Sequence, residues 1–146
     1  MKGSDTVTNN GFGVAVAISG STVVAGAPGV SKAAGRTYVF DQSGSAWKQS
    51  AELKGSDTAG SNDLGYAVGI SGDTVVAGAP GVAKDAGRSY LFARTGASWK
   101  QAAEVKGSNT AGGDYFGYSV AISGNAAIAG ADGHAKSAGR AYLFQA

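Results

Sequence analysis

The polar residues best suited to binding a ligand recur along the chain at a spacing of 52 residues. They are Lys32, Lys84 and Lys136; Arg36, Arg88 and Arg140; and Asp5, Asp57 and Asn109. Equivalent charged side chains of this kind suit a repeating ligand such as a glycan, because several weak contacts then act together. The alternative, which we favour, is that the arginines pair with acidic loops to fix the spacing of neighbouring units, while the lysines keep the surface soluble.

Two further acidic residues belong to the same candidate set. Asp57 and Asp63 share one glycine-rich stretch, which suggests a cation site, but the pattern shifts to Asn10 in the first copy and Asp114 in the third. We therefore interpret these side chains as Asx caps of a loop. The complete set of candidate binding residues is Lys32, Lys84, Lys136, Arg36, Arg88, Arg140, Asp57, Asp63 and Asp114.

The residues needed for catalysis are scarce. His134 is the only histidine and the chain has no cysteine, so no nucleophile and base can be paired from matching positions. His134 replaces Val30 and Val82 of the other copies and lies near Asp132, which makes a His–Asp pair a weak candidate for a metal or proton site. We favour drift of the third copy, and predict that the protein is not an enzyme and holds no cofactor.

Composition excludes several partners. The chain is 43% hydrophobic and 15% charged, with a formal charge of +2, which is typical of a packed globular protein without a basic stripe for nucleic acid. No apolar run approaches the roughly 20 residues of a membrane span, and the first residues do not resemble a signal peptide. The sequence thus predicts a soluble chain that neither binds nucleic acid nor inserts into a membrane.

Four short segments of the first copy have the pattern of strands bounded by glycine-rich turns, at residues 14–19, 22–28, 36–41 and 47–53. In the first segment Val14, Val16 and Ile18 fall on one face and alanines on the other. Both faces need cover, so we predict a β-propeller, in which the bulky face of each four-stranded antiparallel blade packs on the small face of the next. Trp47 and Trp99 are either sugar platforms or packing residues, and we favour packing.

The repeat divides the chain into residues 2–53, 54–105 and 106–146, and the third unit lacks its last strand. The copies are similar enough to indicate recent duplication or deliberate construction. Three blades cannot close a ring, because propellers have about 4 to 8 blades. We prefer a homodimer that closes one six-bladed ring, and the alternative is a fragment of a longer, seven-bladed chain.

The short motifs of each copy carry a family resemblance. "GFG" at 11–13 with "GAP" at 26–28, "DLG" at 63–65 with "GAP" at 78–80, and "YFG" at 115–117 with "GAD" at 130–132 resemble the FG-GAP repeat of bacterial proteins, which is related to the integrin α-chain propeller. Leu64 and Asp132 depart from the motif. Integrin-type blades bind calcium through an acidic D-x-D-x-D-G loop. The equivalent loops here read "SGS", "SGD" and "SGN", so we predict no calcium.

The resemblance also implies a location and a function. The family suggests the outside or surface of a bacterial cell, and it places the candidate binding residues on one rim that contributes to ligand binding in integrins. We expect a non-catalytic scaffold that completes a ring from identical chains. The alternative is a lectin-like or adhesive module that binds glycan or protein through the rim.

Overall fold

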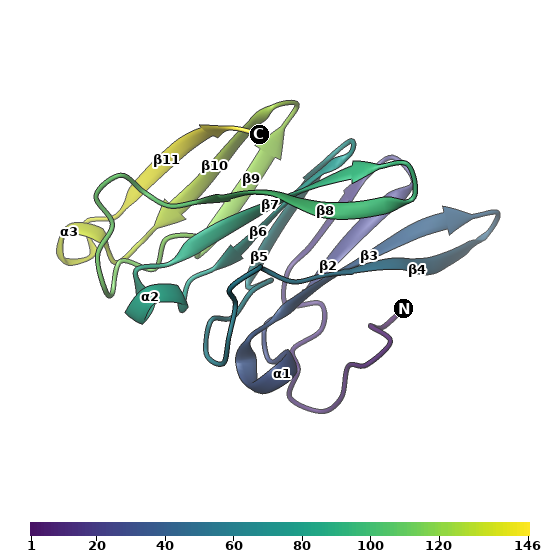
Figure 1. Cartoon of the computed structure of the whole chain (residues 1–146), viewed down its shortest axis with the longest axis horizontal. Helices are drawn as coiled ribbons and strands as arrows, with labels where there is room; N and C mark the ends of the chain where they lie inside the picture. Colours follow the sequence, from purple (N-terminus) through teal and green to yellow (C-terminus); the bar gives the residue numbers. More distant parts are fainter.

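The computed structural model describes residues 1–146 and consists of three antiparallel sheets (Figure 1). The first sheet has the order β1-β2-β3-β4, with bounds Val16–Ser19, Thr22–Ala27, Arg36–Ser43 and Ala46–Leu53. The second has the order β5-β6-β7-β8, with bounds Ala67–Ser71, Thr74–Ala79, Arg88–Thr95 and Ser98–Val105. The third has the order β11-β10-β9, with β9 at Ser119–Ser123, β10 at Ala126–Ala131 and β11 at Arg140–Gln145. The prediction of an all-β fold made of antiparallel sheets is confirmed.

The strands follow the predicted order, but several ends differ from the predicted bounds by one or two residues. β1 begins at Val16 because the N–H of Val14 donates to the carbonyl of Gly11 in a turn, at 3.0 Å. β2 ends before Pro28, which has no N–H for the ladder. β3 and β4 both extend further toward their connecting turn than predicted, since Gly44 adopts φ 64° there and permits a tight reversal.

A short turn that the sequence does not predict follows the second strand of each sheet. These turns are α1 (Val30–Ala33), α2 (Val82–Asp85) and α3 (His134–Ser137). Their inner residues are left-handed: Ser31 and Lys32 have φ 54° and 58°. Side chains other than glycine, asparagine and aspartate adopt this conformation at a cost, so the surrounding structure must hold it. The three turns lie along one edge of the molecule, at the lower side of Figure 1.

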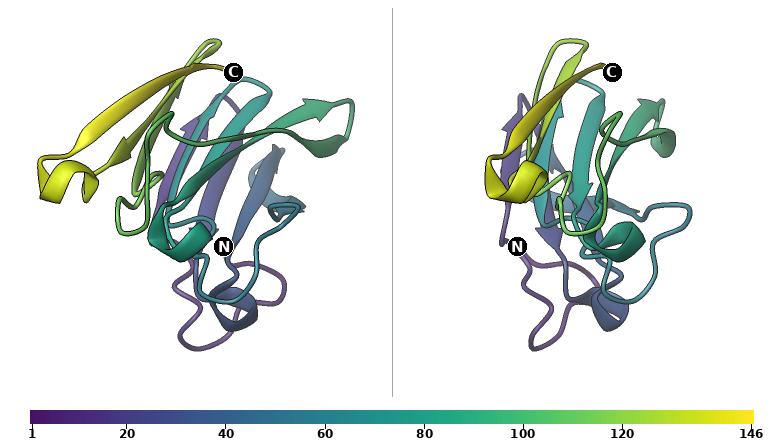
Figure 2. Two further views of the ribbon diagram at one scale, coloured as in Figure 1. Left: turned by 60° about the vertical axis from the view of Figure 1, so that its left-hand side comes forward. Right: turned by 90° about the vertical axis from the view of Figure 1, so that its left-hand side faces the viewer.

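The sheets stack face to face in an open arc, with the first sheet at one end and the third at the other (Figures 1 and 2). Ala17 of β1 packs against the hydrophobic cluster that contains Val68 and Ile70 of β5, which are only 8% and 7% exposed. At the next junction Gly69 of β5 lies against Ile122 of β9. Each junction therefore places bulky residues of one sheet on small residues of the preceding one, as the alternation along the strands predicts.

Candidate functional site

The junction between neighbouring sheets is built on two glycines in direct contact. Gly26 of β2 belongs to one repeat, and Gly65, just before β5, belongs to the next. A Cβ added to Gly26 would overlap the carbonyl oxygen of Gly65, and Gly65 itself has φ 88°. Gly78 and Gly117 repeat the contact at the second junction. Both positions require glycine, because no side chain fits between two backbones at this separation.

Backbone hydrogen bonds reinforce the same junction. The N–H groups of Ser61, Asp63 and Leu64 donate to the carbonyls of residues 32, 33 and 34, at 3.1, 2.8 and 3.2 Å. These carbonyls lie in and directly after the left-handed turn α1, so the turn presents acceptors to the next repeat. The second junction has the equivalent three bonds, from residues 113, 115 and 116 to residues 84, 85 and 86. Leu64 and Phe116, which occupy the phenylalanine position of the motif, are fully buried there.

The two ends of the arc carry the two halves of this junction without a partner. In the first repeat, the equivalent N–H groups of Asn9, Gly11 and Phe12 donate to no acceptor. In the third repeat, the carbonyls of residues 136, 137 and 138 accept no hydrogen bond. A Cβ on Gly13, the equivalent of Gly65, would meet no atom within 4 Å. Three unpaired donors at one end thus match three unpaired acceptors at the other.

The side chains at the two ends are also unpaired. Val16 and Ile18, which we call the head face, are 66% and 64% exposed, although their equivalents in β5 are buried. Leu143 and Ile128 of the third sheet, which with Ala121 form the tail face, are 74% and 41% exposed. Shallow hollows lie on this tail face. The equivalents of Leu143 and Ile128 in the first two repeats are at most 2% exposed: Val24, Val39, Val76 and Leu91.

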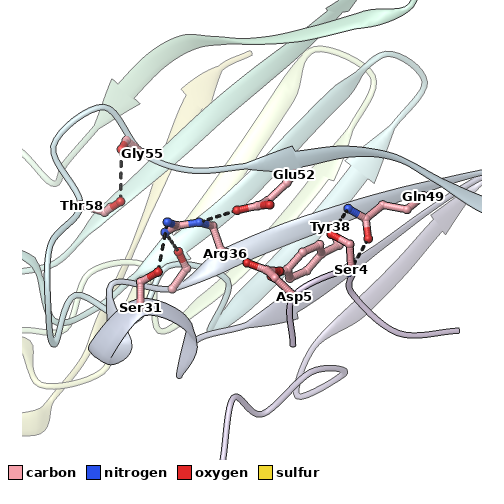
Figure 3. A network of polar contacts seen from close by, with 10 residues as sticks. Ser4, Asp5, Ser31, Arg36, Tyr38, Gln49, Glu52, Gly55 and Thr58 are labelled. Atoms are coloured by element: carbon pink, nitrogen blue, oxygen red, sulfur yellow. Dashed lines mark hydrogen bonds and ion pairs between the residues drawn. The ribbon is translucent and has the colours of Figure 1, made fainter. Parts of the chain in front are cut away.

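The predicted rim arginines differ in their contacts. Arg36 pairs with Glu52 and Arg88 with Glu104, each at 2.7 Å (Figure 3 shows the first pair). The prediction that they pair with acidic loops to set blade spacing is wrong, since each glutamate lies on the neighbouring strand of the same sheet. Strand register brings these residues together, and sequence spacing alone does not reveal that register. Arg140 is exposed and has no acidic partner.

The three rim lysines occupy equivalent exposed positions. Lys32, Lys84 and Lys136 lie in α1, α2 and α3 and form no ion pair. They remain predicted binding residues, and they are set along the edge that carries the three turns (Figure 1).

The acidic candidates are held by local contacts. The hydroxyl of Tyr90 donates to Asp57 at 2.6 Å, and burial together with this carboxylate raises the pKa of Tyr90 above its ordinary value. Asp5 accepts the hydroxyl of Tyr38 in the first repeat (Figure 3). Asp63 is partly buried, and burial and the charge of Asp85 raise its pKa. None of these carboxylates lies in a group that could bind a metal.

The Asx cap predicted for Asp63 belongs to the preceding residue. Asn62 accepts the N–H of Ala59 at 2.8 Å through its side-chain oxygen. Asn10 makes the same contact with Val7, and Asp114 with Ala111. The cap therefore occurs in all three repeats, at positions that the repeat spacing aligns.

His134 pairs with Asp114 instead of the predicted Asp132. Its Nδ1 lies 2.8 Å from Oδ2 of Asp114, and both side chains are 12% exposed. In the first repeat, the amide of the equivalent Asn10 donates to the carbonyl of Gly29 at 3.2 Å. A carboxylate cannot donate, and His134 supplies a hydrogen-bonding partner for it. The change from asparagine to aspartate and the change from valine to histidine are therefore coupled, which a column-by-column comparison of the repeats would have revealed.

This pair makes the third repeat sensitive to acid. The hydrogen bonds from His134 and from the backbone of Ala111 lower the pKa of Asp114 in the folded chain. A lowered folded-state pKa gives stability above the unfolded value of about 3.9, and this stability is lost as the pH falls through the folded value. We expect Asp114→Asn combined with His134→Val, which restores the residues of the other repeats, to flatten the loss of stability below pH 4. Urea unfolding at a series of pH values measures this, and equal acid sensitivity of both proteins would contradict it.

No group of three or more histidine, cysteine, aspartate or glutamate side chains is placed to hold a metal ion. The helices are too short to cross a membrane.

Comparison with known proteins identifies the repeats. A family model described as FG-GAP repeat matches residues 1–40, 47–92 and 99–144. A search of curated proteins found no match. The matched ranges include every glycine contact that joins one sheet to the next. The chain is therefore a member of the FG-GAP repeat family and a β-propeller repeat module.

Proposed function

We propose that this module is a non-catalytic scaffold that self-associates head to tail, so that the tail face of one chain receives the head face of a second. The main support is that the open ends of the first and third repeats carry the two unpaired halves of a junction that occurs twice inside the chain. In each internal junction, a left-handed turn and the residue after it accept three N–H groups, two glycines touch, and apolar side chains cover the apolar face of the preceding sheet, which includes Val24 and Val39 at the first junction.

The proposed association follows from the physics of the exposed faces. Apolar side chains left in water at both ends favour burial, at about 25 cal/mol for each Å² removed from water. In such an assembly, the three N–H groups of one chain would donate to the three carbonyls of the other, in the same arrangement as at the internal junctions. Two chains joined at both ends give six blades, which lies within the range of about 4 to 8 blades for closed propellers. The proposed assembly is therefore a homodimer with twofold symmetry.

A complementation experiment tests the head-to-tail arrangement. Ile18→Lys places a charge on the head face and Leu143→Lys places one on the tail face, and both residues are exposed in the single chain. We expect each variant alone to be a monomer, because every junction that it could form would pair an intact face with a charged one. An equimolar mixture keeps one intact head and one intact tail, and should give a heterodimer by analytical ultracentrifugation.

Other outcomes separate the alternatives. If only Ile18→Lys disrupts the assembly, the head faces associate with one another. If neither variant changes the mass, the ends are not the interface and the proposal fails. Lys100→Gln, which removes an exposed charge on β8 of the middle sheet, is the control and should leave the mass unchanged.

A second candidate function is lectin-like or adhesive binding, and its support is the equivalent exposure of Lys32, Lys84 and Lys136 along one edge. Extracellular placement, which the family resemblance suggests, would suit this role. The test is a glycan array with the wild-type chain and Lys84→Ala. Reproducible binding that Lys84→Ala abolishes would support it, and a blank array would argue against glycan binding.

A further inference from the structure

Two tyrosines of neighbouring repeats form a contact that the proposed self-association does not use. Tyr66 directly precedes β5 and Tyr118 directly precedes β9, so they occupy the same position of the second and third repeats. The hydroxyl of Tyr66 donates to that of Tyr118 at 3.0 Å. The two ring centroids lie 4.8 Å apart, with 41° between the ring planes. In the first repeat this position is Val14, so the contact occurs only between the second and third repeats.

The backbone holds both side chains in place. The N–H of Tyr66 donates to the carbonyl of Asp63 at 3.0 Å. The N–H of Tyr118 donates to the carbonyl of Tyr115 at the same distance. Gly117, directly before Tyr118, touches the backbone of β6 in the second repeat. Groups that a fold holds in contact react far faster than groups that must meet by diffusion, so the two rings are preorganised to react with each other.

The other four tyrosines are not placed for such a reaction. Tyr38 and Tyr90 are fully buried, and the hydroxyl of each donates to a carboxylate. The hydroxyl of Tyr142 donates to Asn109. Tyr115 is 39% exposed, but its ring does not pair with that of another tyrosine. The chain also has no cysteine, so a disulfide cannot link its repeats.

We propose that Tyr66 and Tyr118 form an oxidative cross-linking site, at which a one-electron oxidant joins the two rings as a dityrosine. Tyr118 is 43% exposed and Tyr66 is half-buried, so an oxidant in the solvent reaches the pair. The rings of a dityrosine join at the carbons beside the hydroxyl-bearing carbons, and its two hydroxyls therefore lie close enough to hydrogen-bond to each other. The two hydroxyls already have this arrangement in the folded chain.

The reaction balances with hydrogen peroxide and a peroxidase as the oxidant. Each phenol loses one electron and its hydroxyl proton, which gives two tyrosyl radicals. A Cε of Tyr66 then bonds to a Cε of Tyr118, and the hydrogens on these two carbons move to the oxygens as the rings regain aromaticity. The chain loses two hydrogen atoms in total, and one hydrogen peroxide is reduced to two waters. The product closes a covalent loop between two repeats, which lowers the entropy of the unfolded chain.

Oxidation of the wild-type chain with peroxidase and hydrogen peroxide tests the proposal. We expect the intact mass, measured under denaturing conditions, to fall by two hydrogen atoms while the product remains a single chain. Trypsin should then release residues 55–84 and 107–136 as one linked peptide, whose fragmentation assigns the link to residues 66 and 118. The urea concentration at the midpoint of unfolding should rise in the linked chain.

Phenylalanine variants supply matched controls. Tyr66→Phe and Tyr118→Phe keep the ring and remove the phenol, so each should lower the yield of the linked peptide at least about tenfold. Oxidation should leave the urea midpoint of both variants unchanged. Tyr115→Phe removes another exposed phenol from the same tryptic peptide and should leave the yield of the link unchanged.

Several results would overturn the proposal. They are the absence of a link, a link through Tyr115 or Tyr142, a covalent product at twice the chain mass, and an undiminished yield in Tyr118→Phe. An unchanged or lower urea midpoint in the linked chain would also overturn it, because a product that fits the folded geometry must stabilise the fold. A wild-type chain that stays monomeric in solution counts against self-association alone, because both tyrosines belong to the same chain.

Discussion

Replacing Gly78 with alanine is expected to destabilise the chain by more than about 3 kcal/mol, a large part of the 5–15 kcal/mol typical of a folded domain. The added Cβ would overlap the carbonyl of Gly117 in the next repeat. Both partners are backbone, so relief requires the second and third sheets to move apart. Urea unfolding followed by circular dichroism measures the loss, and a value below about 1 kcal/mol would contradict this role of the glycine pair.

The chain supplies a matched control for this substitution. Gly130 is the equivalent residue of the third repeat, but an added Cβ there would meet only the side-chain oxygen of Ser119 in close contact. That hydroxyl can rotate away, so Gly130→Ala should cost less than about 1 kcal/mol. Equal losses for Gly78→Ala and Gly130→Ala would show that the effect comes from strand propensity instead of the junction.

Replacing Phe116 with alanine is expected to cost about 3–5 kcal/mol, the range for deleting a buried phenylalanine. Phe116 is fully buried, and its ring lies 5.4 Å from that of Tyr142 and 5.6 Å from that of Phe144. Its backbone N–H also donates to the carbonyl of Ala86, directly after α2, and so joins the third repeat to the second. Urea unfolding measures this loss of stability. The m-value, which is the slope of the unfolding free energy against urea concentration, should stay close to that of the wild-type chain.

Phe12 is the matched control, because it packs on Tyr38 and Phe40 of its own repeat at 5.8 and 6.0 Å. It lies at the open end of the arc and is only partly buried. Phe12→Ala should therefore cost about half as much in the single chain, since less apolar area is lost. If Phe12→Ala and Phe116→Ala lower the free energy of unfolding equally, the burial of Phe116 against the preceding repeat contributes little to stability.

Much of the fold could be predicted from the sequence because the relevant signals are local or periodic. The repeat spacing, the glycine turns and the alternation of Val16 and Ile18 with alanines indicate the strands and which face packs on which. The left-handed turns gave no such signal, because Ser31 and Lys32 carry no glycine signature for positive φ. The same conformation occurs in α3, which no following repeat contacts, so it is set within each repeat, where the N–H of Gly139 donates to the carbonyl of His134 as Gly35 does to Val30.

The contacts of the candidate site were harder to predict from the sequence, because they depend on how strands and loops are placed in three dimensions. Glu52 reaches Arg36 only through the register of β3 with β4, which contains an irregularity between Val39 and Phe40. The pairing of His134 with Asp114 joins residues from two loops. Such contacts depend on the tertiary structure, whereas the equivalent positions of the three repeats can be read directly from the sequence.

The complementarity of the two ends of the arc is tested most directly by the mass of the chain in solution. Sedimentation equilibrium over a wide range of dilution should give a single species at twice the chain mass of 14.3 kDa, as one six-bladed ring requires. A stable, monodisperse monomer at every concentration would contradict the account, because the head and tail faces would then remain exposed without associating.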